Sequence, residues 1–429
     1  MPRLCTLVLP LILIAPALAA DAPWLDGQIP GLVKIYTYLH ANPELSFKEA
    51  STSKMVAAEL RGAGAAVTEG VGQFGVVAIL ENGKGPTVLV RSDLDALPVT
   101  EATDLPYASK VTTKDDEGNM VGVMHACGHD VHMTCLIGTA RWLAEHKADW
   151  KGTVILIGQP AEERIGGAKA MLADGLYTRF PKPDFALALH VSHDLEAGKV
   201  AYTSGPAMAS STSVDVHVMG KGGHGAMPHN TVDPIVLAAA LVMDLQTIVS
   251  REVSPIQPSV ITVGSIHGGT KHNIIPNEVR MQLTLRSFDE NVTKLLIDGI
   301  KRRAEGLAFA HKAPAPKVII SDSTPPTINT PSLVAKVIPF IKASIGDSNV
   351  AAVEATMGAE DFGLFGQGGV PTFMFRLGTI PPAKLASFTS KGETPPSLHS
   401  ALYFPDPEPS IRTGITAMTS AVCGLLPPK

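Results

Sequence analysis

The amino-acid sequence predicts an α/β fold in two parts: a larger domain with a mostly parallel central sheet flanked by helices, and an inserted two-layer α+β domain of the split βαβ type. A length of 429 residues favours two domains over a single core. Short apolar runs without polar alternation recur between helical stretches, as expected of strands buried on both faces of a parallel sheet. Between residues 208 and 322 the pattern changes to alternating strands and amphipathic helices.

The elements of the larger domain follow from these runs in chain order. The first helix is expected to open after Pro43 and to close at Gly62 and Gly64. A helix at 131–146 and a last helix near 409–425 are also expected. Buried strands are expected at residues 75–80, 87–91, 153–158 and 185–189, and at PTFMFRLG.

The inserted segment has the order β-α-β-β-α-β. STSVDVHVMG places Val214, Val216 and Val218 on one face of the first strand, and the helix after it carries Pro234 in its first turn. The remaining elements are SVITVGSI, EVRMQLTLR, ENVTKLLIDGIKRRAEGLAFA and PKVIISDS, and STPPTINTP reads as a linker. We therefore expect a discontinuous larger domain, residues 21–207 and 323–429, around an insert at 208–322.

Residues 1–20 have the pattern of a cleaved secretory signal peptide. Arg3 precedes an apolar stretch that ends in Ala-Leu-Ala at residues 17–19. An uncleaved membrane anchor is the alternative, but Pro10 and Pro16 interrupt the stretch, which is shorter than the ~20 residues of a spanning helix. No later segment is expected to span a bilayer. The mature protein is thus predicted to be exported, periplasmic or secreted, without stable membrane insertion.

The composition predicts a folded protein and disfavours nucleic acid as a partner. Its hydrophobic content of 45% and charged content of 17% disfavour disorder. The formal net charge is −5, and no run of Lys or Arg provides an electrostatic footprint for a phosphate backbone. A small-molecule partner is therefore favoured over nucleic acid.

The octapeptide HACGHDVH, residues 125–132, predicts a metal site. It holds three His, a Cys and an Asp, although the whole chain has only 14 His and 4 Cys. Thiolate and imidazole together suit zinc or a similar ion. Cys127 and His129 are expected in the loop at the start of the following helix, where ordinary capping needs neither side chain. His125, Asp130 and His132 stay open between supporting the ligands and capping the helix.

Further metal-type ligands follow three of the predicted strands. Asp93 and Asp95 follow the second strand, Glu162 and Glu163 the third, and His190 comes directly after the fourth. Working groups gather beyond the carboxyl ends of strands in open α/β sheets, so these side chains should meet at one edge. Each of these residues also has an ordinary structural reading when it is considered alone. The aspartates could be turn or helix-cap residues, the glutamates could begin a solvated helix, and His190 could be a core histidine. Adjacent glutamates also suit a metallohydrolase, where one holds the ion and the other transfers protons, but spacing does not assign the roles.

In order along the chain, these motifs resemble the M20 family of metallopeptidases. The resemblance covers the chain from about residue 36 and rests on LHANPELSFKE, RSDLDALP, HACGHD, QPAEE, LHV, GGHGAMPHNTVDP, NIIPNEV, GAEDF and LHS. It is strongest to the N-acyl-amino-acid amidohydrolases, which include hippurate hydrolase-like and indole-acetyl-amino-acid hydrolase-like enzymes. Two departures, His193 in LHVSHD and the missing proline after the terminal HS, concern the shape of the pocket.

The resemblance implies a catalytic domain with two divalent metal ions. Its ligands would be Cys127, His129, Glu163, His190 and His399. Glu162 would be the general base for a metal-bound water, and Asp95 is expected to orient a ligand, since metal-bound imidazoles usually donate their second nitrogen to a carboxylate. Zinc is the leading candidate, with manganese, cobalt or nickel as alternatives.

The resemblance also implies that the insert is a lid through which two chains form a homodimer. His224 would reach the active site of the partner subunit and stabilise the tetrahedral oxyanion. Asn273 and Arg286 would bind polar and carboxylate groups of the substrate; without the resemblance, Arg286 is equally well read as a surface strand residue.

The expected function is metal-dependent hydrolysis of N-acyl amino acids, or of small peptides with a free carboxylate. A carboxypeptidase or dipeptidase with the same machinery is the nearest alternative, and a metal- or peptide-binding protein without chemistry is the alternative of a different class. The second glutamate favours an enzyme, because a pure binding site has no use for an unligated carboxylate beside the metal.

Overall fold

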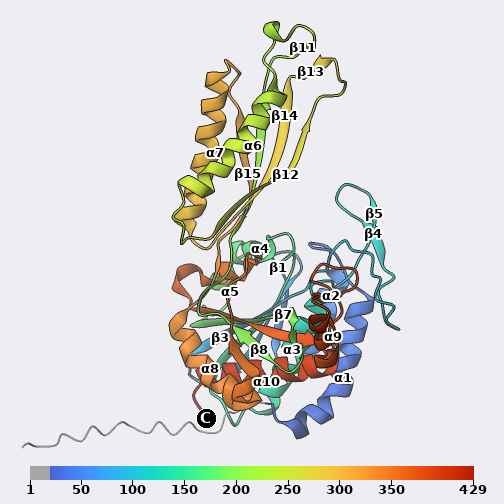
Figure 1. The fold of residues 1–429 in the computed structure, drawn as a ribbon. Helices are drawn as coiled ribbons and strands as arrows, with labels where there is room; N and C mark the ends of the chain where they lie inside the picture. The colour runs from blue at the N-terminus through green and yellow to red at the C-terminus, as the bar shows by residue number, and fades with distance from the viewer. Residues whose placement is uncertain (1–19) are drawn as a thin grey trace, which may run out of the picture.

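The computed structural model describes residues 20–429, which form two bodies (Figure 1). The predicted signal peptide, apart from Ala20, lies outside the described residues. The large body contains an eight-stranded sheet with helices on both faces, and the small body, residues 211–324, contains a four-stranded sheet. This confirms the predicted fold class.

The large sheet is parallel in its centre. Its strands have the order β1 (Ala66–Val71), β2 (Gly75–Asn82), β6 (Gly152–Gln159), β3 (Thr87–Asp93), β7 (Phe185–Glu196), β18 (Thr372–Ile380), β8 (Val200–Tyr202) and β17 (Val350–Ala352). The four strands from β6 to β18 run parallel, whereas β1 and β2 are antiparallel at one edge and β8 is antiparallel to β18.

Both faces of the large sheet are covered. One face packs against α1 (Ala22–Ala41), α3 (His129–Glu145), α8 (Pro331–Ile345) and α10 (Pro407–Leu425), and the other against α4 (Gly167–Ala173), α5 (Leu176–Arg179) and the 3-10 segment η3 (Asp361–Gly369). Along β6, Val154 and Leu156 enter the first core while Ile155 and Ile157 enter the second. Burial of both faces explains why these strands lack polar alternation.

The small body is a sheet of four antiparallel strands covered on one face by two helices. Its elements are β10 (Ser211–Met219), α6 (Pro234–Arg251), β12 (Ser259–Gly268), β14 (Glu278–Ser287), α7 (Glu290–Ala310) and β15 (Lys317–Thr324), with strand order β12-β14-β10-β15. Val214, Val216 and Val218 pack beneath the helices. A short ribbon of β11 (Gly223–His224) and β13 (Ile274–Ile275) forms the end farthest from the large sheet (Figure 1).

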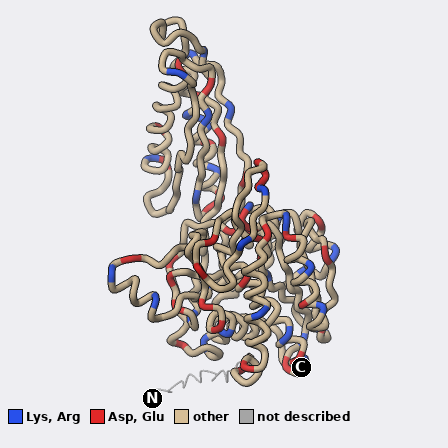
Figure 2. Tube along the Cα trace, turned by 90° about the vertical axis from the view of Figure 1, so that its right-hand side faces the viewer, with Lys and Arg blue, Asp and Glu red and all other residues tan. Residues whose placement is uncertain are grey.

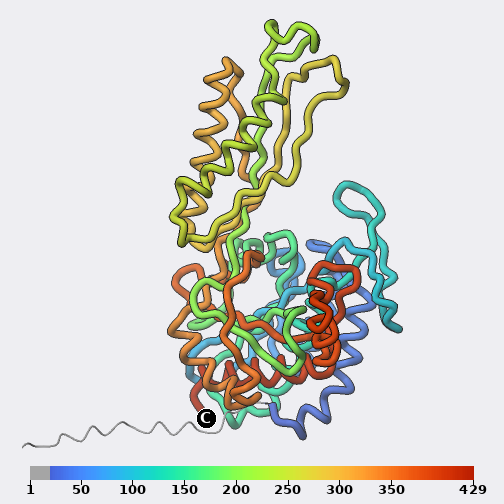
Figure 3. Tube along the Cα trace, in the orientation of Figure 1, coloured from blue at the N-terminus to red at the C-terminus, as the bar shows by residue number. Residues whose placement is uncertain are grey.

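The chain passes between the two bodies twice, at adjacent positions. β9 (Gly205–Met208) leads into the small body and pairs antiparallel with β16 (Thr327–Asn329), which leads out of it (Figure 3). The segment read as a linker therefore contains a strand. Lys and Arg are interspersed with Asp and Glu along both bodies (Figure 2).

Two predicted boundaries differ from the structure. Helix α2 (Ala50–Gly62) begins at Ala50 instead of after Pro43, because Leu45 forms a β-bridge with Ala96 and the Glu44 carboxylate accepts hydrogen bonds from the N–H groups of the helix start. Strand β7 does not stop before His190, because β18 pairs with it as far as Glu196.

Helix α6 also corrects an expectation. By length and composition alone it is long and apolar enough to cross a membrane, contrary to the prediction that no segment after the signal peptide is. Leu237, Leu241 and Leu245 on one side of it are buried in the small body, so it serves as a core helix. Its other side exposes Val236 and Met243, by 56% and 71%.

Candidate metal centre

The start of α3 presents the first two candidate ligands. Cys127 lies in the preceding loop and His129 is the first residue of the helix, with Gly128 between them at φ 72°. A Cβ atom on Gly128 would lie 2.7 Å from Cγ2 of Val191. Only glycine accommodates both this left-handed conformation and the close approach to β7. The loop therefore lies directly against the strand that carries His190.

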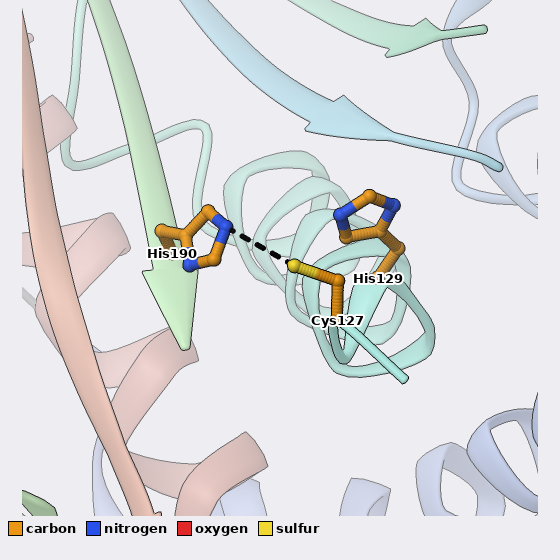
Figure 4. A group of neighbouring side chains, drawn as sticks. All are labelled: Cys127, His129 and His190. Atoms are coloured by element: carbon orange, nitrogen blue, oxygen red, sulfur yellow. Dashed lines mark hydrogen bonds between the residues drawn. The ribbon is translucent and has the colours of Figure 1, made fainter. Parts of the chain in front are cut away.

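Cys127, His129 and His190 converge at this point (Figure 4). Sγ of Cys127 lies 3.6 Å from Nε2 of His190. Nδ1 of His129 is 2.7 Å from the main-chain carbonyl oxygen of Asp95, and Nδ1 of His190 is 2.8 Å from that of Val191. When both Nδ1–H groups donate to these carbonyls, both Nε2 lone pairs face the cluster, which is the tautomer that binds a metal ion.

Asp95 holds the turn that carries the two glutamates. Its carboxylate oxygens each accept a main-chain N–H at 3.0 Å, one from Glu162 and one from Glu163, and Ser46 Oγ donates to it at 2.6 Å. Both glutamate side chains are nearly buried in this non-helical turn, so they are not a solvated helix start. Asp95 orients His129 through its carbonyl oxygen, since its carboxylate is 3.6 Å from Nδ1, and this differs from the expected carboxylate contact.

His399 completes the cluster from a loop near α10. Its Nε2 lies 3.5 Å from the Glu163 carboxylate, and ligand atoms of Cys127, Glu163 and His399 lie within 4.8 Å of one another. Its main-chain N–H donates to the carbonyl of Ala126 at 2.9 Å. His399 adopts φ 68°, a conformation that non-glycine residues hold only where surrounding contacts enforce it. All five candidate ligands and Glu162 therefore meet in one cluster.

The lid residues lie elsewhere in this single chain. His224 and Asn273 are exposed on the β11–β13 ribbon, at the end of the small body farthest from the cluster (Figure 1). Arg286 is half-buried near the end of β14, at the base of the small body. The structure brings none of the three to the metal-type ligands.

Sequence reasoning did not assign a buried ionic network beside the cluster. Arg91 Nη1 donates to Asp93 at 2.6 Å, and Nη2 donates to Glu360 at 2.8 Å and to Asp361 at 3.2 Å. Glu360 and Asp361 belong to the GAEDF motif, to which the resemblance assigns no role. The sequence feature that could have indicated this network is the pair of charged residues, Arg91 and Asp93, at the end of an otherwise apolar strand.

His132 supports the cluster and does not ligate. Its Nδ1–H donates to Asp93 at 2.7 Å, and its Nε2 accepts the main-chain N–H of Val191 at 2.9 Å. Both ring nitrogens are therefore occupied. This answers the question that the sequence left open for His132.

The donor set fits bound cations. His129 Nε2 and Glu163 Oε1 are buried without a hydrogen-bond partner among residues 20–429. Burial raises the pKa of Glu163 to about 8, and burial together with Glu360 raises the pKa of Glu162 well above its usual range. Burial also raises the pKa of the Cys127 thiol. Divalent cations would satisfy the two atoms and offset this excess of buried carboxylates.

Comparison with known proteins gives a consistent result. The model of the peptidase family M20/M25/M40 matches residues 89–389. Thermostable carboxypeptidase 2 of Saccharolobus solfataricus is 40% identical and covers 81% of this chain and 86% of its own length. Hippurate hydrolase of Campylobacter jejuni is 38% identical, over 77% of this chain and 84% of its own length.

A solved structure extends the likeness to both bodies. The Bacillus subtilis YXEP protein, a dinuclear metal binding peptidase from the M20 family, aligns with a TM-score of 0.75 at 27% identity. The alignment covers 94% of this chain and 99% of that protein. A cluster of five converging ligands and a dinuclear relative together support two divalent metal ions.

Proposed function

We propose, from the premise that this chain belongs to the peptidase family M20/M25/M40, that it is an exported amidohydrolase of N-acyl amino acids with Glu162 as the general base. The family membership makes the chain a metal-dependent enzyme that acts on amide or peptide bonds. What we propose beyond this is the identity of the general base, the class of substrate and the export of the protein.

The observation that carries the proposal is the difference between the two adjacent glutamates. Both carboxylates lie near His129 Nε2, at 3.7 Å for Glu162 and 3.9 Å for Glu163. Glu163 also contacts His399 and lies within ligand distance of Cys127, whereas Glu162 lies beside Asp93 and Glu360. Both are anchored by the Asp95 carboxylate through their N–H groups, so their positions relative to each other are fixed. One glutamate can thus ligate while its neighbour stays free to transfer protons.

Five side chains would hold the ions: Cys127, His129, Glu163, His190 and His399. When bound, the ions polarise the amide carbonyl and make water a stronger acid. Glu162 takes a proton from the attacking water and delivers it to the leaving amine nitrogen. Burial and the neighbouring Glu360 raise the pKa of Glu162, which makes its carboxylate a stronger proton acceptor than a solvated glutamate.

The substrate proposal rests on the relatives and on the cavities beside the cluster. Hippurate hydrolase acts on an N-acyl amino acid by its name, and the carboxypeptidase relatives favour peptides as the second candidate. A cavity of about 250 Å³ adjoins His190 and Leu398, and another of about 380 Å³ adjoins Glu163. Two cavities at the ligands suit a substrate with a group on each side of the scissile amide.

The test combines metal analysis with hydrolysis of a panel of N-acyl amino acids and dipeptides, before and after chelation. About two ions per chain and chelator-sensitive release of the amino acid are expected. Glu162→Gln should abolish turnover and keep the metal content, while the exposed Glu305→Gln leaves both unchanged. Full turnover by Glu162→Gln would refute the assigned base, and metal without any turnover would favour a binding protein.

We propose further that the small body forms a homodimer in which His224 acts on the partner's site. Exposed Ile235, Val236 and Met243 on α6 and the distance of the ribbon from its own cluster support this. Mixing two inactive variants, Glu162→Gln and His224→Ala, under conditions that exchange subunits should restore about a quarter of wild-type activity, because half of the dimers then contain one intact composite site. No recovery, or a monomer by sedimentation, would contradict it.

Export is proposed from the sequence of residues 1–20 alone. Mass spectrometry of the protein recovered from a secreting host should find a mature N-terminus near residue 21. A chain that keeps residues 1–20 would contradict signal cleavage.

A further inference from the structure

A cavity beside His190 contains a half-buried arginine, Arg376, that forms no ion pair with a carboxylate in the described part of the chain. The cavity, about 250 Å³, lies between the ends of β7 and β18, the β9 crossing and the loop that carries His399, and Arg376 lines it. Arg376 is paired in register with His190 on the adjacent parallel strand. Side chains at paired positions point to the same face of a sheet, so the Arg376 guanidinium lies on the face that carries the metal cluster.

The Arg376 guanidinium is largely free to bind. Its Nη2 donates a hydrogen bond to the main-chain carbonyl of Glu354 at 3.2 Å, and it forms no ion pair with the carboxylates of residues 20–429. Asp194 also lines the cavity; one of its carboxylate oxygens accepts a hydrogen bond from the Ser192 hydroxyl at 2.5 Å, and its negative charge acts on Arg376 without forming an ion pair with it. The planar fork of an arginine matches a carboxylate with two parallel hydrogen bonds.

The second cavity at the cluster offers no such cation. Its two basic residues, Lys48 and Arg164, both pair with Asp116 at the tip of the hairpin of β4 (Thr112–Lys114) and β5 (Met120–Gly122), Lys48 at 3.3 Å. Both cations are therefore already paired, and Asp115, Glu117 and Glu163 add further negative charge to the walls of this cavity. Of the two cavities that touch candidate metal ligands, the one that holds Arg376 is the one suited to an anion.

The remaining walls of this cavity limit the size of the group it receives. They include the apolar side chains Met208, Met374 and Leu398. A volume of about 250 Å³ corresponds to roughly eight water molecules of liquid. This space suits a carboxylate together with a small or medium apolar side chain.

We infer that this cavity is the subsite for the carboxylate-bearing amino-acid part of the substrate, and that Arg376 is the specificity-determining residue that binds the carboxylate. The inference rests on the proposed amidohydrolase function and deepens it. It assigns to the large body a role that the resemblance gives to Arg286 in the small body. The scissile amide would then lie at the metal cluster, with the acyl group directed out of the Arg376 cavity.

The experiment compares N-acetyl amino acids with the corresponding N-acetyl amino-acid carboxamides on the metal-loaded protein, following release of the free amine. The wild-type enzyme should prefer the acid. Arg376→Gln should lower kcat/KM for the acid roughly 10- to 100-fold, the range expected for loss of a charged hydrogen bond. It should change kcat/KM for the carboxamide less than about threefold. Retained hydrolysis of the carboxamide shows that the variant is folded and loaded.

Matched variants make the result decisive. Arg179→Gln, at an exposed arginine paired with Asp174, should keep the full preference for the acid. Arg376→Met, which avoids burying an amide, should behave like Arg376→Gln and replaces it if that variant does not fold. An unchanged preference in the Arg376 variants, or its loss in Arg286→Gln alone, would overturn the inference. A wild-type enzyme that hydrolyses neither substrate would instead overturn the proposed function on which the inference rests.

Discussion

Substitution of Gly128 by alanine should weaken metal binding, because Gly128 joins two candidate ligands in a conformation that alanine tolerates poorly. Alanine at φ 72° costs about 1–2 kcal/mol of folding free energy. The added Cβ would also lie 2.7 Å from Val191 Cγ2 and 3.3 Å from the Tyr403 hydroxyl. Relieving this overlap moves the loop or β7 and costs about 1–3 kcal/mol more.

Gly64→Ala provides the matched control. Gly64 has φ 85°, and a Cβ atom there would meet nothing within 4 Å. Both variants should therefore lose the conformational contribution of about 1–2 kcal/mol in urea denaturation of the chelated protein. Only Gly128→Ala should also lose metal affinity, by roughly 10- to 100-fold, as expected when the supports of a metal site are displaced.

The assay is competition with a chelator of known affinity, with metal binding followed at equilibrium. Gly128→Ala combined with Val191→Ala should recover part of the affinity, because the clashing methyl group is removed. Metal affinity within twofold of wild type for Gly128→Ala would refute the argument that this glycine positions Cys127 and His129.

Three further predictions concern the stability and the metal dependence of the fold. Burial opposes the charge of His40, but hydrogen bonds to Asp130 and Glu101 raise its pKa from 6.5 to about 9. This contribution is fully present below pH 6.5 and is lost as the pH rises through 9, so the free energy of unfolding in urea should fall by up to about 3 kcal/mol over that interval. His40→Gln should remove this slope, and an equal slope in the variant would contradict it. Chelation should lower the melting temperature of the wild type, because removing the cations leaves the buried carboxylates unbalanced; an unchanged melting temperature would count against the metal centre. Asp95→Asn should weaken metal binding with little change in secondary structure by circular dichroism, because the Glu162–Glu163 turn loses a charged acceptor; unaltered affinity in a chelator titration would show that the turn holds without it.

The parts of the fold that depend on local pattern could be predicted from the sequence. The central strands of the large sheet and the β-α-β-β-α-β order of the small body follow from apolar periodicity, whereas the two-residue strands β11 and β13 do not. The start of α2 could not be found in this way, because it depends on a bridge between Leu45 and Ala96. The end of β7 likewise depends on β18, which lies far along the chain.

The same distinction holds for the site. Thiol and imidazole in HACGHDVH are unusual enough to indicate a metal on their own, whereas Arg91 and Glu360 acquire meaning only when folding brings them together from positions 269 residues apart. The sequence likewise gives no indication of a role for Arg376, because that role depends on its pairing with His190 on the neighbouring strand. The sequence pattern indicates residues whose chemistry is distinctive, whereas residues such as these arginines are recognised only from their neighbours in the folded structure.

The position of β18 has a consequence for how the protein is made. This strand lies inside the large sheet between β7 and β8, yet it is synthesised after the whole small body, which ends at Thr324. At translation rates of about 5–20 residues per second, the 48 residues from Thr324 to Thr372 take roughly 2–10 s. During that interval the small body has all its strands while the large sheet still lacks a central one. His399 emerges later still, so the nascent chain cannot assemble its full set of metal ligands until synthesis has passed both.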